Sequence, residues 1–226
     1  MNYKVIATGS TGNAVLINDI VLIDCGVPYK SISPYLKKIK IILLTHGHTD
    51  HICESTIRRI ANDKPLIRFG CCEWMVPILL ECGVAKSKID LFKIGKIYDY
   101  KLFRLSPIKL YHDVPNCGYR LFFGEEKMMY ATDTAHLQGI SAKGYDLYLI
   151  EANYEEEELQ KRIDQKVEAG EYAYEFRVRN THLSKAQADE FIFNNCKEES
   201  IYEYLHIHID RGGIGNEQSD IYGFRI

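Results

Sequence analysis

The sequence lacks any apolar run approaching the roughly 20 residues that a membrane-spanning helix requires. Its longest apolar runs, residues 41–44 and 76–80, have the length of a buried strand and a short helix. The first residues also lack the basic stretch and the following apolar stretch of a secretory signal peptide. We therefore expect neither membrane association nor export.

The chain also has little excess charge of either sign. It contains 28 Lys and Arg against 31 Asp and Glu, a formal net charge of −3. Long nucleic acids are held by a strong positive field, so a nucleic-acid contact would have to come from a local patch or from a bound metal. With 46% hydrophobic residues in 226, the chain can bury one substantial core or two small ones, which excludes disorder as its main state.

Seven cysteines are present, but no C-x-x-C pair occurs, which argues against a zinc ribbon. Their odd number and scattered spacing also argue against a disulfide framework. We expect reduced thiols, which are typical of a cytoplasmic protein.

The hydrophobic pattern predicts a mixed α/β domain. Strands are expected at 40–44, 65–69, 147–151 and 201–209, and helices at 72–80, 155–167 and 186–194. This order suggests two sheets, or one large sandwich, with helices outside. Because no repeat or composition break interrupts the pattern, we expect one domain over residues 1–210, with the Gly-rich tail 211–226 packed on it.

The most informative segment is residues 45–51, T-H-G-H-T-D-H, between a buried strand and a helix. Its imidazole and carboxylate groups, on His46, His48, Asp50 and His51, are ligands that suit zinc, manganese or iron. In extended backbone His46 and His48 point the same way, and the other two come around the turn. A lone histidine is more often an ordinary core residue, but three of the chain's eight histidines in one loop favour a site for two metal ions.

Further candidate ligands follow later strands. His112 and Asp133 each end an apolar run, although alone they are equally well a loop residue and a turn-forming aspartate. His182 directly precedes a predicted helix. His206 and His208 lie on one face of the last predicted strand, which is also the pattern of a solvated edge strand.

Together these motifs resemble the metallo-β-lactamase fold superfamily, whose H-x-H-x-D-H motif is complete at residues 46–51. The loop 9–14 (G-S-T-G-N-A) and the segments 151–153 (E-A-N) and 181–184 (T-H-L-S) are similar to those of a small bacterial and phage group of exonucleases and phosphodiesterases. The last segment also resembles a motif of tRNA 3′-processing endoribonucleases, with Thr181 in place of the usual glycine. The resemblance covers about residues 3–210.

The resemblance implies a four-layer αββα sandwich of the α/β class that holds two divalent metals, with zinc expected and manganese or iron as alternatives. The implied ligands come from several motifs: His46, His48 and His112 for one metal, Asp50, His51 and a terminal histidine for the other, and Asp133 between them. His208 is favoured over His206 as the terminal ligand because it lies nearer the strand's end. Asp24 is expected to orient a ligand histidine.

The implied function is that of a dinuclear metal-dependent phosphodiesterase or nuclease using a metal-bridging hydroxide. The expected catalytic residues are Asp50 and His182, and His182 would protonate the leaving oxygen or stabilise its charge. We expect the substrate to be a nucleic-acid end or a small nucleotide. A cyclic nucleotide is a specific alternative, because the acidic run 155–158 suits a long DNA track badly. A local basic rim near His182 could still form from a set of later residues: Lys161, Arg162, Lys166, Arg177 and Arg179.

Other classes of function stay open. A thioester or lactone hydrolase of the same fold would use the same ligands, but His182 and residues 151–153 weigh against it. A metal or nucleotide sensor is disfavoured by the complete ligand set. A redox di-iron protein is disfavoured because His48 stands where such proteins carry a carboxylate. The assembly is also open, with a homodimer as one option.

Overall fold

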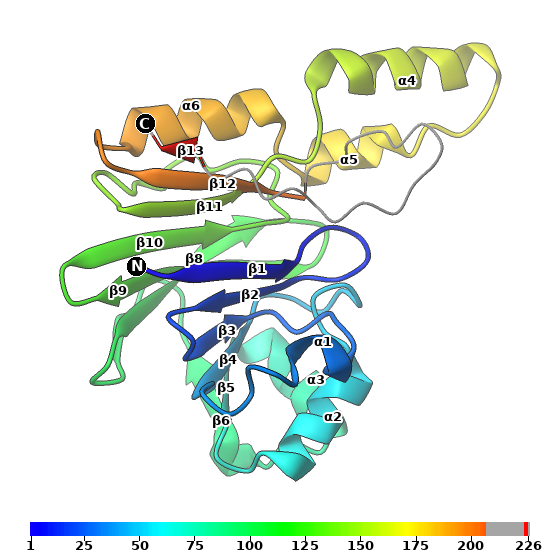
Figure 1. Cartoon of the computed structure of the whole chain (residues 1–226). Coiled ribbons are helices and arrows are strands. Elements are labelled where there is room, and N and C mark those ends of the chain that lie inside the picture. Colours follow the sequence, from blue (N-terminus) through cyan, green and yellow to red (C-terminus); the bar gives the residue numbers. More distant parts are fainter. Residues whose placement is uncertain (207–223, 226) are drawn as a thin grey trace. The chain divides into compact units, whose positions relative to one another are not determined.

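The computed structural model describes residues 1–206 and 224–225. The chain divides into two compact units, the first comprising Met1–Lys109 and Val114–Gly118, the second Leu110–Asp113 and Tyr119–Ile226. Figure 1 follows the chain from one end to the other. The expected α/β class is confirmed, since the strands form two mixed sheets and helices occur in both units.

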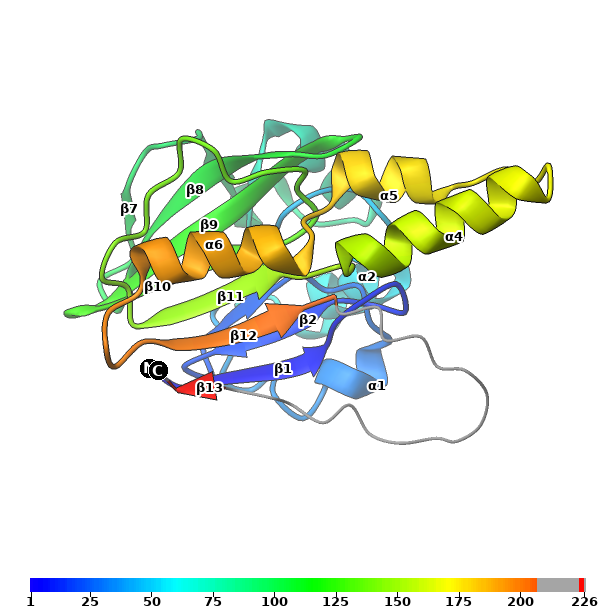
Figure 2. The same cartoon turned by 90° about the horizontal axis from the view of Figure 1, so that it is seen from above.

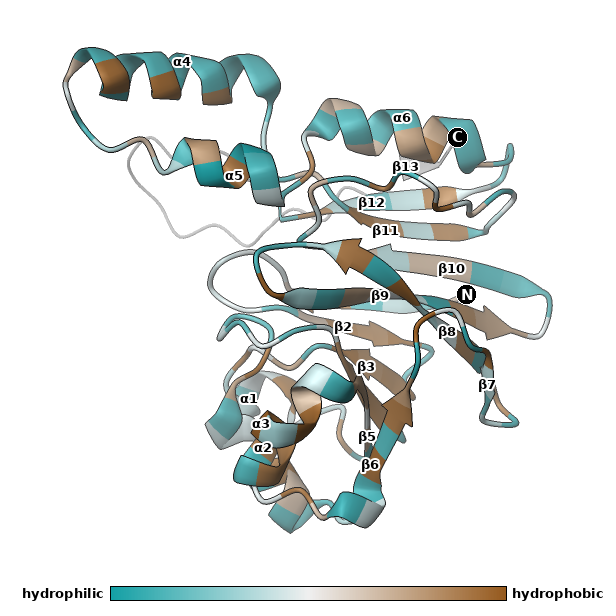
Figure 3. Ribbon diagram, turned by 180° about the vertical axis from the view of Figure 1, so that it is seen from behind, coloured by the Kyte–Doolittle hydropathy of each residue, from teal (hydrophilic) through white to brown (hydrophobic). Residues whose placement is uncertain are grey.

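The first unit is built on a six-stranded sheet with the order β1-β2-β3-β4-β5-β6. Its strands are β1 (Tyr3–Ala7), β2 (Ala14–Ile17), β3 (Val21–Ile23), β4 (Ile41–Leu44), β5 (Arg68–Cys72) and β6 (Ile89–Phe92). β1, β2 and β3 pair antiparallel, whereas β3 to β6 pair in parallel. Every residue of β2, β3 and β4 is buried, which explains why these strands are continuous apolar runs; Figure 3 shows β2 and β3 as hydrophobic throughout.

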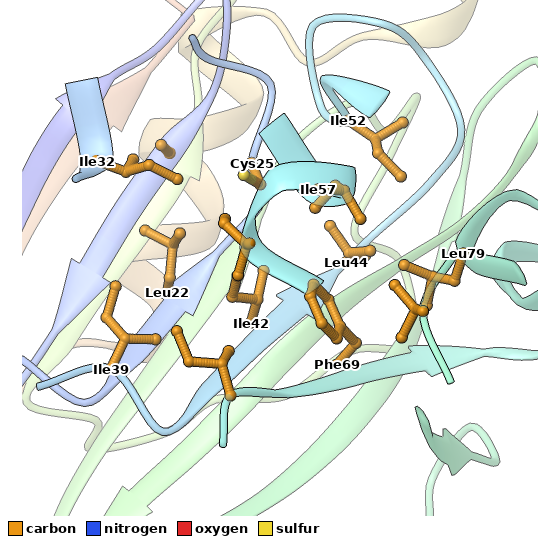
Figure 4. Packing of buried hydrophobic residues seen from close by; sticks show 14 of the residues in the cluster. Leu22, Cys25, Ile32, Ile39, Ile42, Leu44, Ile52, Ile57, Phe69 and Leu79 are labelled. Atoms are coloured by element: carbon orange, nitrogen blue, oxygen red, sulfur yellow. The ribbon is translucent and has the colours of Figure 1, made fainter. Parts of the chain in front are cut away.

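Helices α1 (Tyr29–Ile32), α2 (Glu54–Asp63) and α3 (Val76–Glu81) cover one face of this sheet (Figure 1). Two 3-10 helices, η1 (Glu73–Met75) and η2 (Lys86–Lys88), flank α3. Figure 4 shows Leu22 and Ile42 of the sheet packed with Ile57 of α2. This apolar layer supports the segment that follows β4.

We expect the truncation of a side chain in this core to lower the stability of the protein. Leu22 is fully buried, so Leu22→Ala should lower the free energy of unfolding by about 2–5 kcal/mol through the lost contacts and the cavity left behind. Leu66, at 86% exposed, provides the matched control, and Leu66→Ala should change it by no more than about 0.5 kcal/mol. Urea denaturation of both variants measures the difference. Equal losses would mean that this cluster is not the core.

The second sheet has seven strands in the order β13-β12-β11-β10-β9-β8-β7. They are β7 (Tyr98–Asp99), β8 (Arg104–Tyr111), β9 (Pro115–Phe123), β10 (Glu126–Ala131), β11 (Leu147–Glu151), β12 (Ile201–Leu205) and β13 (Phe224–Arg225). β10, β11 and β12 pair in parallel, and β9 runs antiparallel to β10. The carboxyl ends of β10, β11 and β12 therefore lie at one edge of the sheet.

Three helices belong to the second unit: α4 (Glu156–Glu168), α5 (Glu175–Thr181) and α6 (Lys185–Asn195). α6 lies over β11 and β12, whereas α4 and α5 extend beyond the carboxyl ends of these strands (Figure 2). α6 begins at a capping box, in which the Ser184 side chain accepts from the Gln187 backbone N–H and the Gln187 side chain accepts from the Ser184 backbone N–H. The predicted helices 155–167 and 186–194 are confirmed with shifts of one residue.

Two predicted elements differ from the structure, and one helix was missed. The strand predicted at 65–69 begins at Arg68, because Leu66 lies in an exposed turn and Arg68–Cys72 pairs with β4. The helix predicted at 72–80 is divided into η1 and α3. α5 was not predicted at all.

The late segments are described only in part. The strand predicted at 201–209 is seen as β12, and residues 207–209, including His208, lie outside the described residues. Of the predicted tail, only Phe224–Arg225 is described, paired antiparallel with β12. All seven cysteines carry free thiols, five of them buried. Within the described ranges, no helix is long and apolar enough to cross a membrane.

Candidate metal centre

The H-x-H-x-D-H loop lies between β4 and α2 and gathers its side chains in the first unit. The ring centroids of His46 and His48 are 4.8 Å apart, and those of His46 and His51 are 4.1 Å apart. His46 and His51 are fully buried, whereas His48 and Asp50 are partly exposed. We call His46, His48, Asp50 and His51 the N-terminal cluster; the structure brings together all four residues that the motif predicts.

Asp24 is the buried support of this cluster. Its carboxylate accepts hydrogen bonds from the Thr45 backbone N–H and hydroxyl, both at 3.0 Å, and from His51 Nδ1 at 2.8 Å. A carboxylate can only accept here, so the proton of His51 lies on Nδ1 and its lone pair on Nε2. The Thr45 hydroxyl, which donates to Asp24, accepts in turn from His46 Nδ1 at 3.0 Å. Both rings thus use Nδ1 for a hydrogen bond, which leaves Nε2 as the nitrogen that can bind a metal.

Asn13 joins the glycine-rich loop 9–14 to the cluster, a role that the sequence did not reveal. Its Nδ2 lies 2.9 Å from His51 Nε2 and 3.3 Å from Asp50 Oδ2. Its backbone N–H donates to the Asp50 carbonyl at 2.7 Å, and its Oδ1 accepts from the Gly9 N–H at 2.9 Å. An asparagine that is 1% exposed in a glycine-rich loop needs partners for its amide, and two of those partners lie in the metal-ligand motif.

Gly26 is the position where the backbone comes closest to the motif. A Cβ there would lie 1.7 Å from the Asp50 carbonyl oxygen and 2.7 Å from the His51 nitrogen. Gly26→Ala is therefore expected to displace Asp50 and His51, and a displacement of about 1 Å costs roughly 100-fold in rate. The variant should bind less metal per chain, measured by mass spectrometry, and unfold at a lower temperature.

Gly47→Ala is the matched control within the same loop. Its Cβ would meet only the terminal Cδ1 of Ile78, at 3.0 Å, and that flexible side chain can move aside. It should keep close to the wild-type metal content. Equal metal loss in both variants would show that the loop tolerates no substitution, rather than that Gly26 has a special role.

A second group of titratable side chains lies in the second unit, at the ends of its strands. We call it the C-terminal cluster: His112, Asp133, Glu151, His182 and His206. Asp133 follows β10, Glu151 ends β11 and His206 follows β12, so parallel pairing brings these three to one edge. Two sets have ligand atoms within 4.8 Å of one another, His112 with Asp133 and His182, and Asp133 with Glu151 and His206.

Glu151 orients His182. The Nδ1 of His182 hydrogen-bonds to Glu151 Oε1 and lies 3.4 Å from Asp133 Oδ1. Burial alone would lower the pKa of His182, but the hydrogen bond and charge of Glu151, with the charge of Asp133, raise it above its usual value. The predicted site omitted Glu151, although a carboxylate at the end of an apolar run is the signal that had identified Asp133.

His112 and His206 are held in different ways. Nδ1 of His112 donates to the Thr181 carbonyl at 2.9 Å, and its Nε2 lies 3.1 Å from Asp113 Oδ1. Burial lowers the pKa of His112, against the opposing charge of Asp133, and so favours the neutral, metal-binding ring. His206 Nε2 lies 3.8 Å from Asp133 Oδ2. Of the two rival terminal ligands, the structure therefore places His206 in the cluster, while His208 lies outside the described residues.

Three of the residues that form or support the two clusters have an unusual backbone conformation. Asp24, Asp133 and His206 have φ values of 58°, 55° and 62°. Residues with a Cβ rarely adopt this left-handed conformation, which costs on the order of 1–3 kcal/mol. This strain lies at the support of the N-terminal cluster in the first unit and within the C-terminal cluster in the second.

The basic residues expected to form a rim are largely paired within the second unit. Arg177 pairs with Asp113, and Lys166 with Glu175 at 2.7 Å. Arg179 donates to Gln160 at 2.6 Å, and Arg162 lies 4.0 Å from Glu158. Three of the five predicted positive groups thus have a carboxylate partner inside the chain, which reduces the uncompensated charge that could hold a long polyanion.

The donor set of both clusters fits divalent metals. It consists of imidazole nitrogens and carboxylate oxygens, the ligands of zinc, manganese and iron. Asp24, Thr45 and the Thr181 carbonyl hold the rings in the required tautomers, and such orienting partners are typical of real metal sites.

Comparison with known proteins bears on both fold and family. The solved structure of YhfI from Bacillus subtilis, a metallo-β-lactamase fold protein, is 17% identical with a TM-score of 0.69, and the match covers 92% of this chain and 86% of that one. The short form of human tRNase Z is 15% identical with a TM-score of 0.66, covering 92% and 93%. A diphosphatase of the PhnP family is 15% identical with a TM-score of 0.64, covering 98% and 96%. No curated protein sequence matches.

At these identities the structural likeness shows the fold, which is the metallo-β-lactamase fold expected from the motifs. The family itself is shown by a family model described as a β-lactamase superfamily domain, which matches residues 20–201, well over half of the chain. The chain therefore belongs to the β-lactamase superfamily and is a hydrolase of the metallo-β-lactamase fold.

Proposed function

We propose that this protein is a dinuclear metal-dependent phosphodiesterase that acts on nucleotides or on nucleic-acid ends. The observation that carries the proposal is His182, an imidazole of raised pKa held by a buried glutamate within the C-terminal cluster. Such a group can give a proton to a leaving oxygen. Human tRNase Z and a PhnP-family diphosphatase among the similar structures support this class of reaction.

The proposal includes the ligand assignment that the family resemblance implies. It lists His46, His48 and His112 for one ion, Asp50, His51 and His206 for the other, and Asp133 for both. We choose His206 rather than His208 because of its distance to Asp133. Zinc is the first candidate for the metal, followed by manganese and iron.

In the proposed mechanism, the two bound ions would lower the pKa of a water and stabilise negative charge on the phosphate. Asp24 and Thr45 keep the N-terminal imidazoles in one tautomer and orientation. Asn13 holds Asp50, the other expected catalytic residue, through its side chain. Glu151 holds the Nδ1 proton of His182, so that His182 Nε2 can donate its proton to the leaving oxygen.

The charge of the protein indicates how large its substrate is. A net charge of −3 and a mostly paired basic rim favour a substrate with one or a few phosphates over a long duplex. Cyclic nucleotides and the ends of short strands both satisfy this condition.

The test is a panel of substrates after removal of metal and reloading with zinc, manganese or iron(II). The panel contains bis-p-nitrophenyl phosphate, cyclic mono- and dinucleotides, and 5′-phosphorylated single- and double-stranded oligonucleotides. We expect metal-dependent hydrolysis of phosphodiesters, with small nucleotides ahead of long duplexes. Faster hydrolysis of nitrocefin or of a glutathione thioester would contradict the proposal and indicate a carbon-centred hydrolase.

A further inference from the structure

Tyr111 and His136 form a stacked aromatic pair next to the C-terminal cluster. Their ring centroids are 4.3 Å apart and their planes are inclined by 27°. Tyr111 directly precedes the cluster residue His112, and His136 comes three positions after Asp133. No motif of the sequence and no step of the proposed mechanism uses this pair.

The pair is fixed by backbone hydrogen bonds to the segment that follows Asp133. The Tyr111 N–H donates to Thr134 Oγ1 at 3.0 Å, and the Tyr111 carbonyl accepts from the Ala135 N–H at 2.7 Å. Thr134 Oγ1 in turn donates to the His136 carbonyl at 3.0 Å. Because Thr134 also donates its N–H to Glu151, at 3.0 Å, the stacked pair and the cluster share one rigid support.

The His136 ring is held against Tyr111 by stacking. Its Nδ1 is buried and has no hydrogen-bond partner among the described residues. The ring instead lies against Tyr111, which is 40% exposed although the chain buries other large tyrosines completely, Tyr119 and Tyr148 among them. An exposed aromatic ring that is held rigidly from behind loses little entropy when a flat ligand binds to it.

We propose that Tyr111, backed by His136, is a stacking platform for the nucleobase of the substrate. Aromatic side chains bind every base through its π-face, largely independently of sequence. The proposal rests on the proposed function in one respect, namely that a nucleotide phosphate binds beside His112 and Asp133. It then assigns the substrate class as base-bearing nucleotides rather than phosphodiesters in general.

The kinetic test uses two esters with the same leaving group, thymidine 5′-(p-nitrophenyl phosphate) and the base-free ethyl p-nitrophenyl phosphate. Tyr111→Ala is expected to raise KM for the thymidine ester by about 5- to 150-fold, the range of a lost base stack. It should leave kcat/KM for the ethyl ester and the metal content unchanged. Tyr111→Phe keeps the ring and should stay within about twofold of wild type for both esters. An equal loss on both esters would mean that Tyr111 acts only on the architecture of the site, and no change on either would overturn the platform.

Binding separates this proposal from the proposed function. Calorimetric titration of the metal-loaded protein with thymidine monophosphate needs no turnover, and ribose 5-phosphate is the base-free control. The expected result is a loss of affinity for thymidine monophosphate in Tyr111→Ala, with no change in Tyr111→Phe and no change for ribose 5-phosphate. Wild-type affinity in Tyr111→Ala, or equal affinity of the wild type for both ligands, overturns the platform. If neither ester is hydrolysed but the variants show the expected binding of thymidine monophosphate, only the proposed phosphodiesterase activity is overturned.

Discussion

His182→Ala is expected to lower kcat for phosphodiester hydrolysis by about 10²- to 10⁴-fold, the range for loss of a general acid. The reason is the raised pKa of the ring and its fixed Nδ1 contact with Glu151, which together keep a proton ready at Nε2. The rates are to be measured under saturating substrate, alongside metal content per chain. The metal content should stay at the wild-type value, because His182 is proposed as a proton donor and not as a ligand.

Two further variants make this result specific. Glu151→Gln keeps the shape of the carboxylate but removes its charge, so kcat should fall by less than in His182→Ala, again without metal loss. Asn180 is an exposed residue of α5, the helix that ends just before His182, and Asn180→Ala should behave as wild type. A His182→Ala protein that loses one metal ion together with its activity would instead assign His182 as a ligand.

The second large effect is expected on stability. Asp24→Ala removes the acceptor of three buried hydrogen bonds and leaves the donors of Thr45 and His51 without it. Breaking such a buried pair costs about 3–5 kcal/mol, and loss of an orienting carboxylate typically weakens metal binding by about 10- to 100-fold. Urea denaturation of the metal-free protein isolates the first effect, and competition with a metal chelator measures the second.

Asp63→Ala is the matched control for this measurement. Asp63 pairs with Arg59 at 3.3 Å on the exposed side of α2, where an ion pair contributes only about 0–1 kcal/mol. The metal affinity of Asp63→Ala should be unchanged. A similar loss of stability in the two aspartate variants would argue that Asp24 is only one polar residue among many.

Much of the N-terminal cluster was predictable because its information is local. His46, His48, Asp50 and His51 lie in one loop, so residue type and spacing were enough to indicate a metal site. Asp24 required the family resemblance, since nothing in its own neighbourhood signals that its carboxylate reaches Thr45 and His51.

The residues that sequence analysis missed depend on contacts between distant segments. Glu151 gains its role only when β11 lies beside β10 and α5 brings His182 to it. α5 itself has β-branched and aromatic residues that favour a helix poorly, and contacts outside it hold it in place, among them the ion pair of Glu175 with Lys166. The strand predicted at 65–69 was placed too early because of Leu66. Its apolar side chain suggested a buried strand, whereas Leu66 lies in a turn and is exposed to solvent.

The left-handed backbone conformation at Asp24, Asp133 and His206 lowers the stability of the fold. The side chains at the same three positions serve the proposed reaction. Glycine or asparagine would relax each of these positions, and at Asp133 the exchange would also remove a carboxylate that lies close to Glu151. A laboratory evolution experiment that rewarded only survival of heating would therefore enrich such exchanges and produce robust but inert descendants.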